Sequence, residues 1–71
     1  MVEVVACKQM EDMQFEVIEV EPNALYQIIR INLREAKIDN VFEEYNKINA
    51  MHTYYREVTN CYAEMMRKEY E

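Results

Sequence analysis

The 71-residue chain contains no glycine and no tryptophan, and it has only one proline and one histidine. Glycine-rich loops are the usual cradles for phosphate groups, so the absence of glycine excludes those nucleotide-binding motifs. Catalytic residues also concentrate on loops held by a scaffold, and loops without glycine have little conformational freedom. We therefore expect a protein that is not an enzyme and that uses no cofactor.

Cysteine is scarce as well, since Cys7 and Cys61 could form at most one disulfide bond. The single His52 has no second histidine or cysteine at a spacing suited to zinc, so no metal site is predicted. The chain shows neither a signal-peptide pattern nor the roughly 20 apolar residues of a membrane span. The sequence therefore predicts a cytoplasmic protein with reduced thiols and no membrane partner.

The length predicts a single small domain over residues 1–71. Chains this short rarely bury enough apolar surface alone, and they usually add disulfide bonds, a metal ion or a second subunit. Because the sequence indicates neither a disulfide bond nor a metal site, we expect the stabilising element to be a second copy of the chain.

The net charge is −6, and the charged residues are unevenly distributed. Residues 1–21 carry six acids against one base, whereas Arg30, Arg34 and Lys37 form a basic island further along. A chain with this overall charge is a poor match for the phosphate backbone of nucleic acids. We therefore do not expect nucleic acid as a partner, and a regulator that binds nucleic acid through the basic island is kept as an alternative.

Residues 2–7 and 14–20 are short segments rich in β-branched side chains, and Phe15 and Val17 alternate with Glu16. This pattern predicts a β-hairpin over residues 1–21. The apolar residues of the same region also fall at steps of three and four, so a helix is the competing interpretation. Those residues are Val2, Ala6, Met10, Met13, Val17 and Val20.

Pro22 suits the first turn of a helix, and a medium helix is predicted over residues 22–38. On such a helix the basic side chains Arg30, Arg34 and Lys37 would line one face. Another face, apolar except for Asn32, would carry Leu25, Ile28, Ile29, Asn32, Leu33 and Ala36.

A seven-residue apolar repeat follows, and it predicts one long, coiled-coil-like helix over residues 40–70. Asn40 and Glu43 have the spacing of a helix-capping pair at its start. Such a helix would be roughly 46 Å long, whereas a compact domain of this size is roughly 28 Å across. The excess length predicts a homodimer. Its predicted seam consists of Val41, Ile48, Met51, Tyr55, Val58, Tyr62 and Met65.

The predicted fold is therefore α+β, with an N-terminal hairpin, a medium helix and a long dimerising helix, and the alternative is an all-α bundle. The predicted function is protein–protein interaction, as an adaptor or as an inhibitor that occupies a basic surface of a nucleic-acid-handling partner. Tyr54 and Tyr70 are the expected partner contacts, with Arg30, Arg34 and Lys37 as further candidates. A small enzyme built around His52 and the tyrosines is the second alternative.

Overall fold

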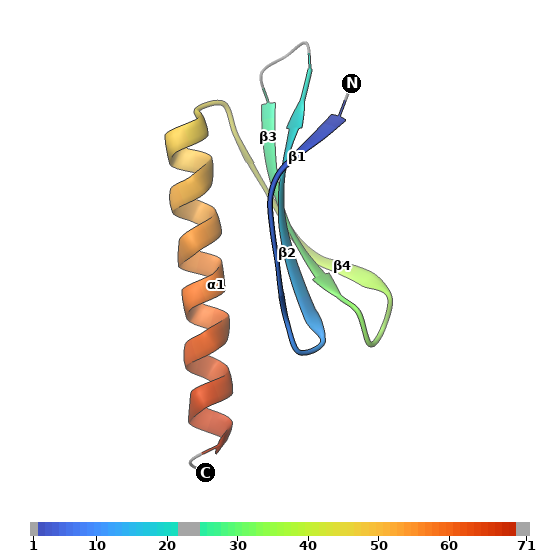
Figure 1. The fold of residues 1–71 in the computed structure, drawn as a ribbon, viewed down its shortest axis with the longest axis vertical. Helices are drawn as coiled ribbons and strands as arrows, with labels where there is room; N and C mark the ends of the chain where they lie inside the picture. The colour runs from blue at the N-terminus through green and yellow to red at the C-terminus, as the bar shows by residue number, and fades with distance from the viewer. Residues whose placement is uncertain (1, 22–24, 70–71) are drawn as a thin grey trace.

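The computed structural model describes residues 2–21 and 25–69, which form a four-stranded antiparallel sheet and one helix (Figure 1). The elements are β1 (Val2–Met10), β2 (Met13–Val20), β3 (Leu25–Asn32), β4 (Lys37–Glu44) and α1 (Lys47–Glu69). The strands follow one another in the order β1-β2-β3-β4, so each strand pairs with its neighbour in the chain. The helix then crosses back along one face of the sheet (Figure 1).

Two tight turns adopt backbone conformations that normally favour glycine. Glu11, between β1 and β2, has a φ angle of 53°, and Ala36, before β4, has a φ angle of 54°. A side chain at positive φ crowds the backbone, which costs roughly 1–2 kcal/mol per residue. The pairing of the flanking strands offsets this cost, because the residues on either side of each turn face one another in the sheet, as Met10 and Met13 do.

Asn46 fixes the start of α1. Its side-chain oxygen accepts hydrogen bonds from the backbone N–H groups of Ile48 at 2.8 Å and Asn49 at 3.3 Å. These donors have no partner within the helix, and an asparagine cap satisfies them. Arg67 and Lys68 lie in the last turn, where their positive charge favours the negative end of the helix dipole.

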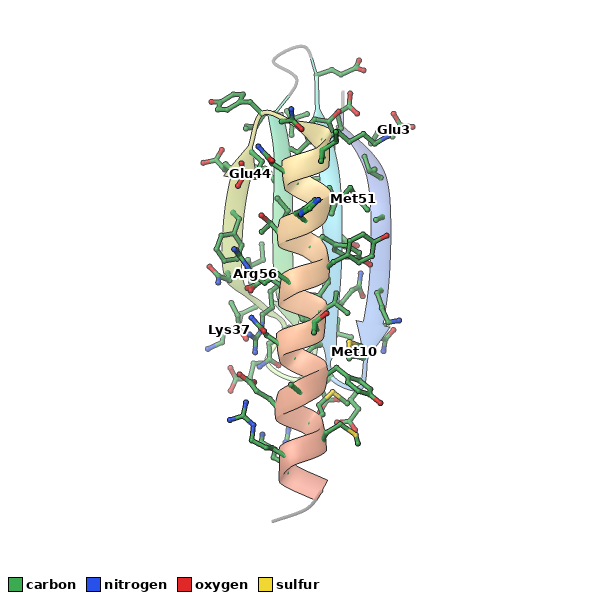
Figure 2. All side chains as sticks on the ribbon, turned by 90° about the vertical axis from the view of Figure 1, so that its left-hand side faces the viewer. Glu3, Met10, Lys37, Glu44, Met51 and Arg56 are labelled. Atoms are coloured by element: carbon green, nitrogen blue, oxygen red, sulfur yellow. The ribbon has the colours of Figure 1, made fainter. Side chains whose placement is uncertain are left out.

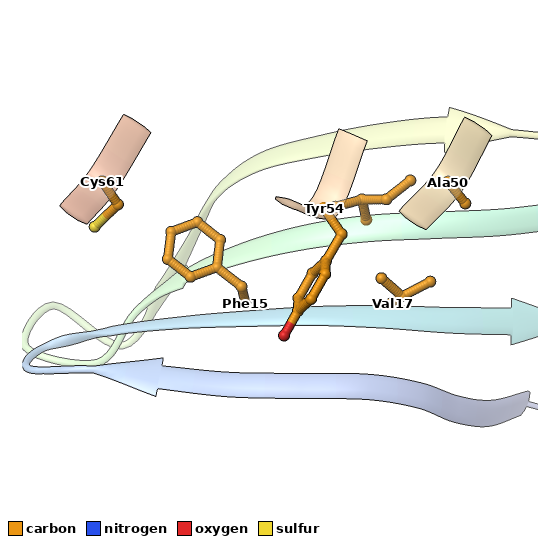
Figure 3. Packing of buried hydrophobic residues seen from close by; sticks show 6 residues of the cluster. Phe15, Val17, Ala50, Tyr54 and Cys61 are labelled. Atoms are coloured by element: carbon orange, nitrogen blue, oxygen red, sulfur yellow. The ribbon is translucent and has the colours of Figure 1, made fainter. Parts of the chain in front are cut away.

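The core lies between α1 and the face of the sheet that the helix covers. Phe15, Val17 and Ile28 from the two central strands are almost completely shielded from solvent. Ala50, Tyr54 and Cys61 descend onto them from the helix (Figure 3). Ala50 is small, so it lets the helix approach the sheet closely, while Tyr54 fills the space above β2. This is a small core for a chain of 71 residues.

The predicted helix over residues 22–38 is wrong. Leu25–Asn32 is β3, and the chain turns before it enters β4 at Lys37; Pro22 lies outside the described residues. β-Branched isoleucines favour an extended strand, and here Ile28 faces the helix while Ile29 and Ile31 lie on the other face. A strand that is apolar on both faces reproduces the spacing of a helix, which explains the error.

The predicted long, coiled-coil-like helix over residues 40–70 is also wrong at its start. Lys37–Glu44 is the edge strand β4, so Asn40 and Glu43 are strand residues and the cap is Asn46. The fold is α+β, with more sheet than helix, and the all-α alternative is not supported. The domain is therefore organised around a sheet that the helix covers on one side.

The molecule is thin for its length. Its Cα atoms extend over 46 × 24 × 15 Å, and their radius of gyration is 12.9 Å, against about 11 Å expected for a compact domain of this length. Its accessible surface is 5183 Å², against about 4,700 Å² expected for its mass. Both comparisons agree with a two-layer structure in which one face of the sheet remains uncovered.

Candidate interaction surfaces

The residues of the predicted seam are divided among three places in the structure. Met51, Val58 and Met65 pack against the core beneath the helix. Ile48, Tyr55 and Tyr62 lie on the solvent side of α1 and are mostly exposed. Val41 belongs to β4, on the face of the sheet away from the helix. Within α1 the seven-residue repeat therefore forms two lines of side chains. One line, Met51, Val58 and Met65, packs the helix onto its own sheet.

The exposed half of the repeat forms a narrow line, which we call the helix ridge and define as Ile48, Tyr55 and Tyr62. The rings of Tyr54 and Tyr55 pack edge to face, with centroids 5.4 Å apart and planes at 62°. Successive ridge residues are seven positions apart, which is roughly two turns or about 10 Å along the helix. The ridge is thus three separated side chains rather than a continuous apolar stripe.

Tyr54 is a predicted partner contact, and in the single chain its side chain is buried against β1 and the core. Its contact with a partner stays a prediction. Burial raises the pKa of the Tyr54 hydroxyl, with smaller contributions from Cys7 and Tyr55. A helix position that points at a sheet buries its side chain whatever its residue type. Tyr70 lies outside the described residues.

The three basic residues do not share a helix face, so the predicted basic stripe is wrong. Arg30 lies in β3 beneath α1 and is half-buried, Arg34 lies in an exposed turn, and Lys37 begins β4. Lys37 pairs with Glu35 at 2.9 Å and with Asp39 at 4.0 Å. These two contacts of Lys37 are the ion pairs found within residues 2–21 and 25–69. Arg34 takes part in neither of them.

A cavity of about 310 Å³ opens between the C-terminal half of α1 and the sheet, beside Arg30. The Nε atom of Arg30 is buried there without a hydrogen-bond partner among the described residues. Burial raises the pKa of the Cys61 thiol, and the nearby Arg30 charge opposes that effect. The charged lining residues are Glu11, Asp12, Arg30, Arg34, Asp39, Glu64 and Lys68. With four acids and three bases, the cavity does not favour an anion, and the protonated thiol is a poor nucleophile.

The face of the sheet away from α1 is the larger uncovered surface, and we call it the open face. Strand register places alternate residues of each strand on it, in pairs such as Ile29 with Val41 and Val4 with Ile18. Its apolar residues are Val2, Val4, Ile18, Val20, Leu25, Ile29, Ile31, Ile38 and Val41. Val2, Val4, Ile38 and Val41 are each between 46% and 62% exposed. Within residues 2–21 and 25–69, no element covers this face.

The apolar residues of the open face run diagonally across the sheet, from the start of β1 to the start of β4, and this band carries no charge. Polar residues occupy the two remaining corners. In one corner Gln14 donates a hydrogen bond to Glu16 at 2.7 Å, and the Cys7 thiol lies 3.9 Å from the same carboxylate. Gln27 and Glu43 form the other corner. The open face therefore has an apolar centre and polar edges, as protein interfaces do.

A second surface lies at the end of the sheet where α1 begins. Glu3, Glu19, Tyr26 and Glu44 are paired in register and form one row across all four strands, on the face that the helix covers lower down. Figure 2 shows Glu3 and Glu44 on either side of the helix start. Desolvation raises the pKa of the Tyr26 hydroxyl, and the adjacent Glu19 carboxylate, which accepts its hydrogen bond, raises it further. We call Glu3, Glu19 and Glu44 the acidic row.

Two exposed apolar side chains follow the acidic row in the chain, where β4 leads into α1. Tyr45, which follows Glu44 directly, is 75% exposed, and Ile48 in the first turn of α1 is 68% exposed. Neither the row nor the open face was predicted from the sequence. The open face could have been found from the apolar residues at alternate positions of residues 14–20, once that segment was known to be a strand with Ile18 and Val20 opposite Phe15 and Val17.

His52 is exposed on α1, on the side away from the core. Among residues 2–21 and 25–69, no group of histidine, cysteine and acidic side chains is arranged to hold a metal ion. The described helix is not apolar enough to cross a membrane. Comparisons with known protein families, with curated proteins and with solved structures give no match.

Proposed function

We propose that the protein is a cytoplasmic protein–protein interaction module that binds a basic surface of a larger partner. The observation that carries this proposal is the acidic row, which places Glu3 and Glu19 opposite each other and Glu44 one strand further on, beyond Tyr26, at one end of the sheet. Side chains opposite one another in a sheet lie about 5 Å apart, and two strands span about 10 Å, so the three charges lie close enough to act on a partner together. An inhibitor that covers a site for nucleic acid is a specific form of this proposal, because such sites are basic.

The distribution of charge supports the proposal. The sheet region, residues 2–44, carries ten acids against four bases, whereas α1 carries four bases against three acids. The net negative charge therefore belongs to the sheet region. A concentrated charge of one sign speeds encounter with an oppositely charged surface through long-range attraction.

Charge alone gives little affinity at an exposed surface, because water and salt screen it. Tyr45 and Ile48, between the end of β4 and the first turn of α1, offer exposed apolar contact area at the same end of the molecule. Tyrosine is common among the residues that contribute most to binding, since it combines a large rigid ring with a polar tip. We propose that these two side chains anchor the partner while the carboxylates orient it.

The half-buried position of Arg30 favours a protein partner over nucleic acid. A protein that binds a phosphate backbone presents several exposed cations together. Here Arg30 lies beneath α1, and Lys37 is already paired with Glu35. The partner we propose is therefore recognised by its positive charge, which complements this chain.

The experiment is affinity capture of the partner from cells of the source organism, with mass spectrometry, comparing two triple variants. Glu3→Gln, Glu19→Gln and Glu44→Gln together remove the acidic row. Asp12→Asn, Glu35→Gln and Glu64→Gln remove the same number of charges elsewhere. We expect a stoichiometric basic partner that the first triple variant loses and the second retains. Equal capture by both variants would contradict the proposal, and so would tight retention of the wild type on duplex DNA at physiological salt.

A further inference from the structure

The open face is apolar at its centre. It is in contact with solvent, because α1 covers only the other face of the sheet. Domains normally bury each apolar face of a sheet against another layer. We infer that a second copy of this chain covers the open face, so that two sheets pack face to face with the two helices on the outside. This inference rests on the proposed function as a binding module and identifies its first partner as itself.

The area of the open face suits a dimer interface. Four strands about 4.8 Å apart and eight residues long at about 3.3 Å per residue give a face of roughly 500 Å². Two such faces bury roughly 1,000 Å² in total, which is the lower bound for a specific interface. A contact that used only one corner of the face would fall below that bound.

The shape of the open face also favours an identical partner. Two packed sheets keep their strands within about 30° of each other, because that angle arises from the twist of each sheet. A second copy has the same twist, so the two surfaces are complementary without further adjustment. The diagonal band carries no charge, so a two-fold interface brings no like charges together at its centre. Glu16 and Glu43 lie in the corners, at the polar rim of such an interface.

The helix ridge is the competing surface for self-association, and the structure argues against it. A coiled coil needs both apolar positions of each seven-residue repeat in the seam. In α1 the positions of Met51, Val58 and Met65 are already occupied by contact with the sheet. The ridge retains only Ile48, Tyr55 and Tyr62, which is too narrow a line to bury the area that a dimer requires.

The test is the molar mass of the full chain, measured by light scattering after size exclusion, in wild type and three lysine variants. Val41→Lys and Val4→Lys place a cation at opposite ends of the apolar band, and Tyr55→Lys places one on the helix ridge. The replaced side chains are 46%, 56% and 60% exposed in the single chain, so each variant is expected to fold, which circular dichroism checks. We expect twice the 8.7 kDa chain mass for wild type and for Tyr55→Lys.

Both open-face variants should raise the dissociation constant by about a hundredfold or more, because a lysine in the band is buried without a partner. The wild-type dimer should persist at high salt, since the band is apolar, whereas a complex with a basic partner should weaken. A monomeric wild type, or a dimer that only Tyr55→Lys dissociates, would overturn the inference. If the monomer still captured a basic partner through the acidic row, the proposed function would stand and this inference alone would fail.

Discussion

The two faces of the sheet have similar side chains and different surroundings. Along β2, Phe15 and Val17 point toward α1 and have no exposed surface, while Ile18 and Val20 point the other way and are only half-buried by their neighbours. The covered face ends in the acidic row on the side where α1 begins, whereas the open face has its polar residues at two corners. The comparison separates the apolar residues that fold the chain from those that remain available for assembly.

This separation also explains why the core is small. Six apolar residues are buried between the helix and the sheet, and nine more lie on the open face, where only their neighbours in the sheet shield them. Covering those nine side chains would create a second apolar layer with more residues than the core beneath the helix. We expect a short chain that divides its apolar residues in this way to gain part of its stability from association.

The largest expected difference between the faces comes from truncating one side chain on each. Phe15→Ala should lower the free energy of unfolding by about 3–5 kcal/mol, because it removes a fully buried ring and leaves a cavity. Ile18→Ala, measured in dilute protein where the chain is a monomer, should cost clearly less, because its side chain is only half-buried there. Urea unfolding followed by circular dichroism measures both.

The outcome that would contradict this account is an Ile18→Ala variant that destabilises the monomer as much as Phe15→Ala does. That result would mean that the open face is already buried in the single chain. Gln14→Ala, on the same strand and face, serves as the polar control and should change the free energy of unfolding only slightly.

A smaller effect is expected at alkaline pH and only on the covered face. Burial holds the pKa of Cys61 above its ordinary value of 9.0 and that of Tyr54 above 10.0, so the folded state favours the neutral forms. Stability from these groups is complete below their ordinary pKa values, and it falls as the pH rises through the raised ones. The urea midpoint should therefore decrease from about pH 9 upward.

Tyr54→Phe should remove part of this alkaline decrease, because phenylalanine has no proton to lose. Tyr55→Phe changes the neighbouring, 60% exposed tyrosine and should leave the decrease unchanged. If both variants lost the same part of the decrease, exposure would not distinguish the two tyrosines as the structure does.

Part of this arrangement could be predicted from the sequence, and the hairpin of β1 and β2 illustrates how. Phe15 and Val17 alternate with polar or outward-facing residues, and the β-branched side chains around them favour strands. In β3 the same reasoning fails, because Ile28, Ile29 and Ile31 are apolar on both faces. Without alternation, a strand and a buried helix have the same local pattern, and only pairing with distant strands decides between them.

The C-terminal repeat shows why the candidate site could be predicted only in part. Ile48, Tyr55 and Tyr62 do recur every seven residues on an exposed line of α1. The sequence could not show that Met51, Val58 and Met65 pack against a sheet of the same chain, since that contact depends on the path of β4. The acidic row is even harder to predict from the sequence. Its three residues come from three different strands and are brought together only by the register of the sheet.

The central claim is that the open face is buried by a second copy, and the concentration dependence of stability tests it most directly. A dimer that forms only from folded chains becomes more stable as the protein concentration rises. We predict that the urea midpoint of the wild type rises between about 1 and 100 μM protein, and that the midpoint of Val41→Lys stays constant. A wild-type midpoint that does not change with concentration would contradict the claim.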